Sequence, residues 1–130
     1  MNFIPNTLYD VIATTWPAAQ LHRAGQWTIR DGQGGGKRVS AATADGPVQP
    51  KDIQQAECAM QELSQRPLFM LRDGEADLDA LLADVGYEMS DPTNIYQAPI
   101  ADIANQRPPK TSMFCIWEPL QIQYDIWAAG

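Results

Sequence analysis

The stretch that most constrains the fold of this 130-residue chain runs from Pro67 to Tyr96. It begins with the apolar run Leu68–Leu71, which is too short for a helix and uniform enough to predict a strand covered on both faces. Apolar residues then recur at the spacing of one helical face, namely Leu78, Leu81, Leu82 and Val85. Gly86 follows where a left-handed helix cap is expected, and Tyr87 begins a second extended segment. The stretch predicts a βαβ-like unit around which the other segments pack.

The segments upstream of this unit predict a hairpin between two helices. Asn6 or Thr7 can cap a first helix that ends near Trp16, and Ala18 to Ala24 is expected to continue as a short helical turn. The residues then alternate from Gln26 to Asp31 and again from Arg38 to Thr43, with a glycine-rich turn between them, which predicts paired strands. Apolar spacing predicts a helix from Lys51 to Gln65, with Pro50 in its first turn.

The composition changes beyond Pro99. A turn of helix is expected at 101–106, followed by a stiff connector at 107–110 that contains two prolines. The apolar run Met113–Trp117 predicts a fifth strand. Leu120–Trp127 favours a helix, although its alternation also fits a strand. These features divide the chain into a domain at 1–106 and a C-terminal part at 107–130, which is either the start of a second unit or an interface arm.

Charge and hydropathy exclude two classes of partner. Nine basic and sixteen acidic residues give a net charge of −7, the opposite of what a phosphate-backbone reader carries. No apolar run approaches the roughly 18 to 20 residues that cross a bilayer. The N-terminal segment has no basic region followed by an apolar one, so no secretory signal is predicted. We therefore expect a cytoplasmic protein that contacts neither nucleic acid nor membrane.

Metal binding is not expected. The only histidine is His22, and the two cysteines, Cys58 and Cys115, are far apart and outside any Cys-x-x-Cys spacing. Cys58 lies in a helical pattern and Cys115 in an apolar run, so both are interpreted as small buried hydrophobic residues.

The glycine-rich run Gly32–Lys37 has some features of a phosphate-binding loop, because glycines let backbone N–H groups approach phosphates. Such a loop needs glycine where the chain has Asp31 and a hydroxyl residue where it has Arg38. It also needs a following helix, whereas the residues after Lys37 alternate like a strand. We interpret the run as a hairpin turn.

No constellation of catalytic residues emerges. Candidate acid or base groups occur singly, without a second member at a diagnostic spacing, and each is interpreted as a solvated or capping residue: Asp10, Asp31, Glu57, Glu62, Tyr87, Glu118 and Tyr124. Ser40 lacks a nucleophile-elbow context. The four tryptophans, Trp16, Trp27, Trp117 and Trp127, are interpreted as core or interface residues rather than a stacking platform. The sequence assigns no catalytic or metal-binding residue and leaves any cofactor-binding residues unidentified.

The order helix, hairpin, helix, buried strand, helix ending in Gly-Tyr and long strand resembles the GNAT N-acetyltransferase fold. The segments Leu68–Leu71 and Leu78–Glu88 look like that family's late strand, last helix and Gly-Phe/Tyr-Glu turn. Thr15–Ala19 and Gly25–Arg30 are similar to the N-terminal halves of bacterial proteins built from two GNAT-like units. The resemblance covers about residues 7 to 98. It implies an α+β fold with a mixed, mainly antiparallel sheet of about five strands, helices on both faces, and acetyl-CoA as the family's cofactor.

Two departures from the GNAT pattern bear on activity. The family holds the acetyl-CoA pyrophosphate on a Q/R-x-x-G-x-G/A loop before the central helix, and this chain has Asp45–Lys51 there, with two prolines and an aspartate. Many members place a tyrosine acid four residues before the glycine of the last helix, where this chain has Leu82. The departures predict that this chain does not bind acetyl-CoA and is not an acetyltransferase by itself.

Two functions follow as hypotheses. In the first, the chain is the degenerate N-terminal half of a two-unit acetyltransferase. It would act as a scaffold for a second GNAT-like unit and would help to recognise an amine acceptor. In the second, it is a small self-associating or partner-binding module that keeps only the fold. Residues 112–127 are apolar enough to pair across a two-fold interface.

Overall fold

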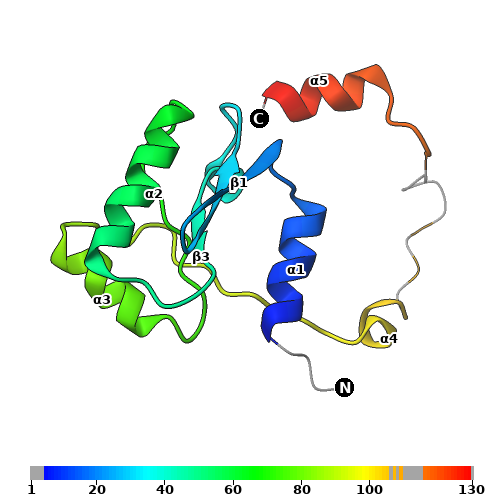
Figure 1. Ribbon diagram of the computed structural model, residues 1–130. Helices are drawn as coiled ribbons and strands as arrows, with labels where there is room; N and C mark the ends of the chain where they lie inside the picture. The colour runs from blue at the N-terminus through cyan, green and yellow to red at the C-terminus, as the bar shows by residue number, and fades with distance from the viewer. Residues whose placement is uncertain (1–4, 106, 108, 110–115, 130) are drawn as a thin grey trace. The chain divides into compact units, whose positions relative to one another are not determined.

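The computed structural model describes residues 5–105, 107, 109 and 116–129 and has an α+β architecture. The chain divides into two compact units, Met1–Ser90 and Asp91–Gly130, each of which is described by itself. The division at 106/107 expected from composition stays a prediction. In the first unit, α2 and α3 lie on one side of a small sheet and α1 lies on the other (Figure 1).

The sheet has three antiparallel strands in the order β1-β2-β3: β1 Gln20–Ala24, β2 Trp27–Asp31 and β3 Ala42–Ala44. The prediction of a helical turn at Ala18 to Ala24 is therefore wrong. All five residues of β1 pair with β2, and Gly25 and Gln26 form a two-residue turn between them. Gly25 has φ +59°, the positive value that such tight hairpin turns require. Pairing with β2 thus overrides the weak helical preference of the isolated segment.

The predicted pairing across the glycine-rich run is confirmed, but the second strand is shorter than expected. β3 begins at Ala42, and Lys37–Val39 forms the 3₁₀ helix η1 instead of strand. Ser40 Oγ donates to the carbonyls of Gly35 and Gly36, which closes the loop on itself. Val39 is buried, so this turn covers part of the fold as well as joining strands.

α2 (Pro50–Glu62) confirms the predicted central helix and supplies one wall of the core. Trp27 and Ile29 of β2 are fully buried beneath it, and the Trp27 Nε1 donates to the Asp52 carbonyl at 2.7 Å. The core is completed from β3, α2 and α3 by Ala42, Ala44, Ile53, Ala56, Met60, Leu78 and Leu82. The alternation predicted for β2 therefore has its apolar side facing α2.

The extended segment Leu68–Leu71 is only half-buried and makes one parallel bridge, Phe69 to Ala42. The backbone of Ala42 donates to the Leu68 carbonyl and accepts from Met70, both at 2.9 Å. The prediction of a strand covered on both faces is therefore wrong in extent. The chain turns away at Arg72, which leaves room for a single bridge beside the three-residue β3.

α3 (Ala76–Asp84) confirms the predicted helix and its glycine stop. Gly86 has φ +94° and donates to the Ala83 carbonyl, while Tyr87 donates to the Leu82 carbonyl, both at 3.0 Å. These two bonds form a Schellman cap. Within the described residues no strand is formed between Tyr87 and Ala98, and Glu88 onward is exposed. The second extended segment therefore pairs with nothing in this part of the chain.

α1 (Pro5–Thr15) confirms the first predicted helix, but it begins at Pro5, so Asn6 and Thr7 lie inside the helix and do not cap it. Side chains hold this helix against the rest of the unit. The Tyr9 Oη accepts a hydrogen bond from the Asp73 backbone N–H at 2.9 Å, and the Arg38 guanidinium lies 4.9 Å from the Trp16 ring centroid. Val11 is about half-exposed, so the apolar face of α1 is only partly covered.

The second unit contains α4 (Ile100–Ile103) and α5 (Gln121–Ala129). α5 confirms the helical alternative for the last segment. All described residues of this unit are exposed. The fifth strand predicted at 113–117 falls largely outside the described residues and stays a prediction. Among the described residues, no helix is long and apolar enough to cross a bilayer.

Of the tryptophans only Trp27 belongs to the core, whereas Trp16, Trp117 and Trp127 are at least half-exposed, which is compatible with interface residues. The interpretation of Cys58 as a buried residue is wrong. Cys58 is exposed, because it lies on the solvent side of α2, away from the face that carries Ala56 and Met60. Cys115 lies outside the described residues.

Candidate functional site

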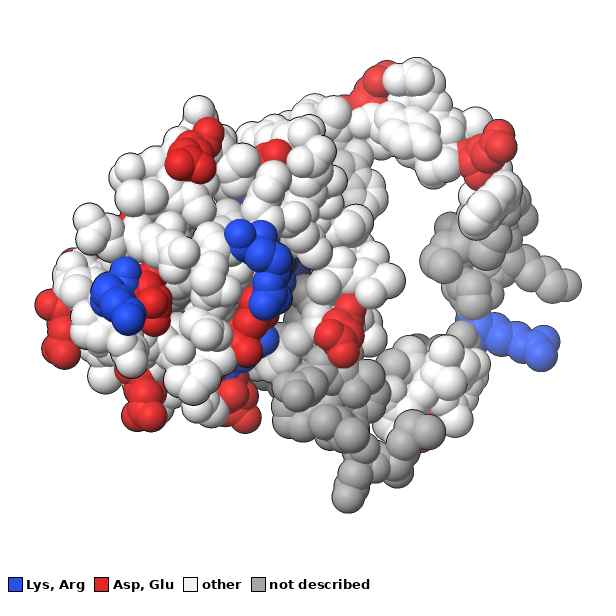
Figure 2. Space-filling view, viewed as in Figure 1, with Lys and Arg blue, Asp and Glu red and all other residues white. Residues whose placement is uncertain are grey.

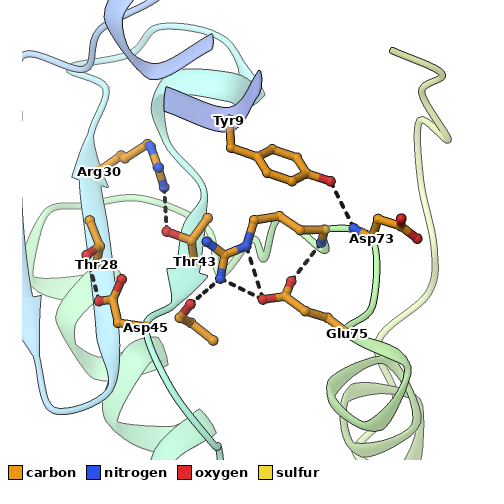
Figure 3. A network of polar contacts seen from close by, with 9 residues as sticks. Tyr9, Thr28, Arg30, Thr43, Asp45, Asp73 and Glu75 are labelled. Carbon is orange, nitrogen blue, oxygen red and sulfur yellow. Dashed lines mark hydrogen bonds and ion pairs between the residues drawn. The ribbon is translucent and has the colours of Figure 1, made fainter. Parts of the chain in front are cut away.

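An open cleft of about 590 Å³ lies in the first unit between α1, the end of β3 and the turn before α3. Its lining is strongly polar, with four carboxylates and one guanidinium: Tyr9, Asp10, Ala44, Asp45, Gly46, Arg72, Asp73 and Glu75. The lining residues come from three separate segments, and only folding brings them together (Figure 3).

The pair Arg72 and Glu75 forms the floor of this cleft. Glu75 accepts from the Arg72 backbone N–H at 2.7 Å and from its guanidinium Nη2 at 2.6 Å. The same Nη2 donates to the Ala44 carbonyl and so ties the end of β3 to the turn. The hydrogen bonds that the Arg72 guanidinium donates to Glu75 are the main reason that the pKa of Arg72 is raised above its usual value. The pair is therefore a firmly held ionic link.

A second group of polar side chains covers the face of the sheet that is turned away from α2. The Asp45 carboxylate accepts from Thr28 Oγ1 at 2.7 Å and from the Arg23 guanidinium at 3.0 Å. Arg30 donates to Thr43 Oγ1 and to the Ala41 carbonyl (Figure 3). Burial, followed by repulsion from Arg72, lowers the pKa of Arg30. The sheet face turned away from α2 is therefore covered by hydrogen-bonded polar side chains and not by an apolar core.

A smaller hollow of about 230 Å³ lies on the other side of Glu75, between the loop before α2 and α3. Its lining is more apolar and includes Pro47, Val48, Leu78 and Leu81, with Asp77 at the edge.

The N-terminus of α2, which faces this region, is closed by the chain's own side chains. Asp52 Oδ2 accepts from the Gln49 backbone N–H at 2.8 Å, and the Asp52 N–H donates to the Gln49 carbonyl at 2.9 Å. Pro50 stands at the first helical position and contributes no N–H. A helix N-terminus normally attracts anions, but here a carboxylate already complements the helix dipole.

The electrostatics of both hollows therefore favour a cation over a phosphate. Asp10, Asp45, Asp73 and Glu75 line the larger hollow, where Arg72 is bonded to Glu75 and Arg23 is bonded to Asp45. Asp10 and Asp73 remain without an ion-pair partner among the described residues. Figure 2 shows acidic side chains spread over the visible surface of the first unit, with few basic ones among them. A group carrying several phosphates would meet repulsion here, whereas an ammonium group would be attracted.

Two of the predicted acid or base candidates, Tyr87 and Glu57, are brought together. The Tyr87 hydroxyl donates to Glu57 Oε1 at 2.5 Å, linking the end of α3 to α2. Burial, and next the hydrogen bond to Glu57, raises the pKa of Tyr87 well above its usual value. A phenol that holds its proton so firmly is a poor acid or base near neutral pH, so the pair is a structural link.

This link predicts a loss of stability at high pH. In the unfolded chain Tyr87 ionises near pH 10, whereas the folded protein keeps it protonated, so stability falls as the pH rises above about 10. The free energy of unfolding, measured in urea at pH 8 to 11, should decline more steeply for wild type than for Tyr87→Phe. Equal slopes for the two proteins would contradict the assignment.

The remaining candidates are not assembled into a site. Asp31 Oδ1 accepts from the Gln33 N–H within a turn, Glu62 is exposed on α2, and His22 lies on β1. Glu118 and Tyr124 are exposed in the second unit. Among the described residues, no three His, Cys, Asp or Glu side chains are grouped as metal ligands. Only Asp10 of the original set lines the larger hollow.

The sequence interpretation missed most of the residues that line the cleft, in particular Tyr9, Arg72 and Glu75. One local signal was present: an arginine followed three residues later by a glutamate across Asp73-Gly74 is the spacing of a self-paired turn. Nothing in the sequence indicates that Tyr9, more than sixty residues away, reaches the same turn.

No protein-family model, curated protein or solved structure matches this chain.

Proposed function

We propose that this chain is a GNAT-like domain of an N-acetyltransferase that does not bind acetyl-CoA or catalyse transfer by itself, and that contributes scaffold and the acceptor side of the cleft. The element order supports the proposal: helix, hairpin, helix, extended segment beside β3, and helix ending in Gly86-Tyr87. In the family's complete fold, further strands would extend the sheet to about five.

The observation that carries the non-catalytic part is the closed N-terminus of α2. Asp52 caps the helix where a pyrophosphate would need free backbone donors, and Pro47 and Pro50 remove N–H groups from the same loop. Leu82, at the position of the family's tyrosine acid, is buried in the core and has no proton to give. Both requirements for acyl transfer from acetyl-CoA are absent at these positions.

The acceptor role rests on the carboxylates of the larger cleft. Asp10 and Asp73 are exposed, lie at its mouth and have no ion-pair partner among the described residues, while Arg72 is bonded to Glu75. A primary or secondary ammonium group would be attracted to these carboxylates by its positive charge and could donate hydrogen bonds to them. Amines are also the acceptors that an N-acetyltransferase uses.

Isothermal titration with acetyl-CoA and with spermidine, a model polyamine, tests the proposal. We expect no measurable binding of acetyl-CoA, and weak, salt-sensitive binding of spermidine that Asp10→Asn with Asp73→Asn reduces several-fold. Asp79→Asn with Asp84→Asn on α3 is the control for net charge alone. Micromolar acetyl-CoA affinity would refute the non-catalytic role, and equal spermidine binding by both double variants would refute the acceptor site.

A second candidate function, a self-associating or partner-binding module, is favoured by the surface of α5. Its apolar side chains, together with Trp117 and Leu120, are more than half-exposed: Ile122, Tyr124, Ile126 and Trp127. A nine-residue helix with apolar residues on several sides gains little stability in water unless another surface covers it. Under this alternative, residues 112–127 form the contact with a second copy or with a second GNAT-like unit.

A further inference from the structure

The sheet of the first unit has one edge that pairs with no strand among the described residues. The β3 edge is bridged by Phe69 and closed further by Arg72. β1 is the outermost strand on the other side, and its five residues pair only with β2. An unpaired edge presents a row of backbone donors and acceptors to any extended chain that approaches it.

The register identifies the outward-facing groups. In antiparallel pairs, each residue directs both its N–H and C=O to the same side, and successive residues alternate. The backbone of Ala42 hydrogen-bonds to Leu68 and Met70, on the side away from β2, and the Asp45 N–H donates to the Gln26 carbonyl. Trp27 and Ile29 lie opposite Ala44 and Ala42, so their backbone groups point away from β3 and toward β1. Their partners are Ala24 and His22.

The backbone groups of Leu21 and Arg23 therefore face outward. They lie two residues apart on β1 and together offer two N–H donors and two carbonyl acceptors. Both side chains project from the sheet face opposite α2 and are largely exposed, Leu21 at 66%. The edge is thus built to pair with one short extended strand.

Two features indicate that the surroundings of β1 are incomplete in the isolated chain. The strand has no proline or lysine, and Arg23 is its single charged residue beside the exposed Leu21. The His22 Nε2 is also buried without a hydrogen-bond partner among the described residues. Orphan buried polar atoms are uncommon in complete native structures.

We propose that β1 pairs with β1 of a second copy, antiparallel and about a two-fold axis at His22. In this register each Leu21 lies opposite the Arg23 of the other copy. The two outward N–H groups and the two outward carbonyls of each β1 are then all hydrogen-bonded. The register also keeps the two Arg23 guanidinium groups from lying directly opposite each other. Like charges at directly opposite positions destabilise a strand pair. A self-complementary strand suits a closed two-fold pairing and yields one continuous six-stranded sheet. The pairing does not depend on the proposed acetyltransferase role.

Sedimentation equilibrium of the full chain over a wide concentration range tests the pairing. Wild type should be a dimer that dissociates on dilution. Leu21→Lys places a cation opposite the partner's Arg23 at both symmetry-related positions, and should weaken the dimer about tenfold. Leu21→Pro removes an outward donor that β2 does not use, and should give a monomer. Gln54→Lys, the same charge change on exposed α2, should leave the dimer unchanged.

The circular dichroism spectrum of each variant must match that of wild type, which shows that the fold is kept. If Leu21→Pro does not fold, the comparison of wild type with Leu21→Lys still tests the pairing. A wild-type chain that is monomeric at all concentrations would overturn the pairing. So would a dimer that survives Leu21→Lys. Dissociation by Ile126→Ser with Trp127→Ser, but not by Leu21→Lys, would also overturn it and assign self-association to α5.

Discussion

Replacing Trp27 with alanine is expected to lower the free energy of unfolding by about 3 to 5 kcal/mol. Trp27 is fully buried against α2, and its ring packs 4.9 Å from that of Phe69. The substitution leaves a cavity at the centre of a small core and also leaves the Asp52 carbonyl without its 2.7 Å donor. In a domain of this size such a loss is a large part of the total stability. Urea denaturation followed by circular dichroism measures it.

Trp16→Ala is the matched control, because Trp16 is about half-exposed and touches Arg38 through a surface cation–π contact. Its expected cost is below about 1 kcal/mol. Comparable losses for the two variants would show that the core between the sheet and α2 does not dominate stability.

Arg72→Ala is expected to cost about 1 to 3 kcal/mol. The change leaves the Glu75 carboxylate half-buried without its guanidinium partner and frees the Ala44 carbonyl at the end of β3. Arg66→Ala, at an exposed arginine of the same unit, should change stability by less than about 0.5 kcal/mol. Urea denaturation of both variants gives the comparison.

A double-mutant cycle with Glu75→Ala isolates the interaction within the pair. We expect the double variant to be more stable than the sum of the single losses predicts, because removing both charges leaves no unpaired ion. Strict additivity of the two losses would mean that the pair does not hold the cleft together, and that its floor is positioned by the backbone of the turn alone.

Local sequence signals predicted the helices well. Pro50 and the apolar spacing that follows it identified α2, and Gly86 identified the end of α3, since each signal depends on neighbouring residues only. The alternation around Trp27 correctly assigned the buried face of β2. These features result from backbone conformational preferences and from periodicity.

Predictions that depend on distant pairing were less accurate. Ala18 to Ala24 has no strong preference of its own and becomes β1 because β2 lies beside it. Leu68–Leu71 is apolar enough for a strand, but its partner β3 is three residues long and supports one bridge. Strand formation depends on a partner that local patterns do not specify.

The candidate site was the least predictable part. Tyr9, Asp45 and Glu75 are each unremarkable in the sequence, and no motif joins them. They share a cleft because α1 crosses the open face of the sheet and Tyr9 accepts from the backbone of Asp73. In contrast, Pro47, Pro50 and Asp45 already predicted a poor phosphate site from neighbouring residues alone.

The sequence alone thus determined the presence of α2 and α3 and the glycine stop after α3, because each follows from preferences within a few residues. Tertiary structure decided which carboxylates face one cleft, that Arg72 is bonded to Glu75, and that β1 pairs, among the described residues, with β2 alone. These properties depend on contacts between residues far apart in the chain, which only the folded backbone brings within hydrogen-bonding distance.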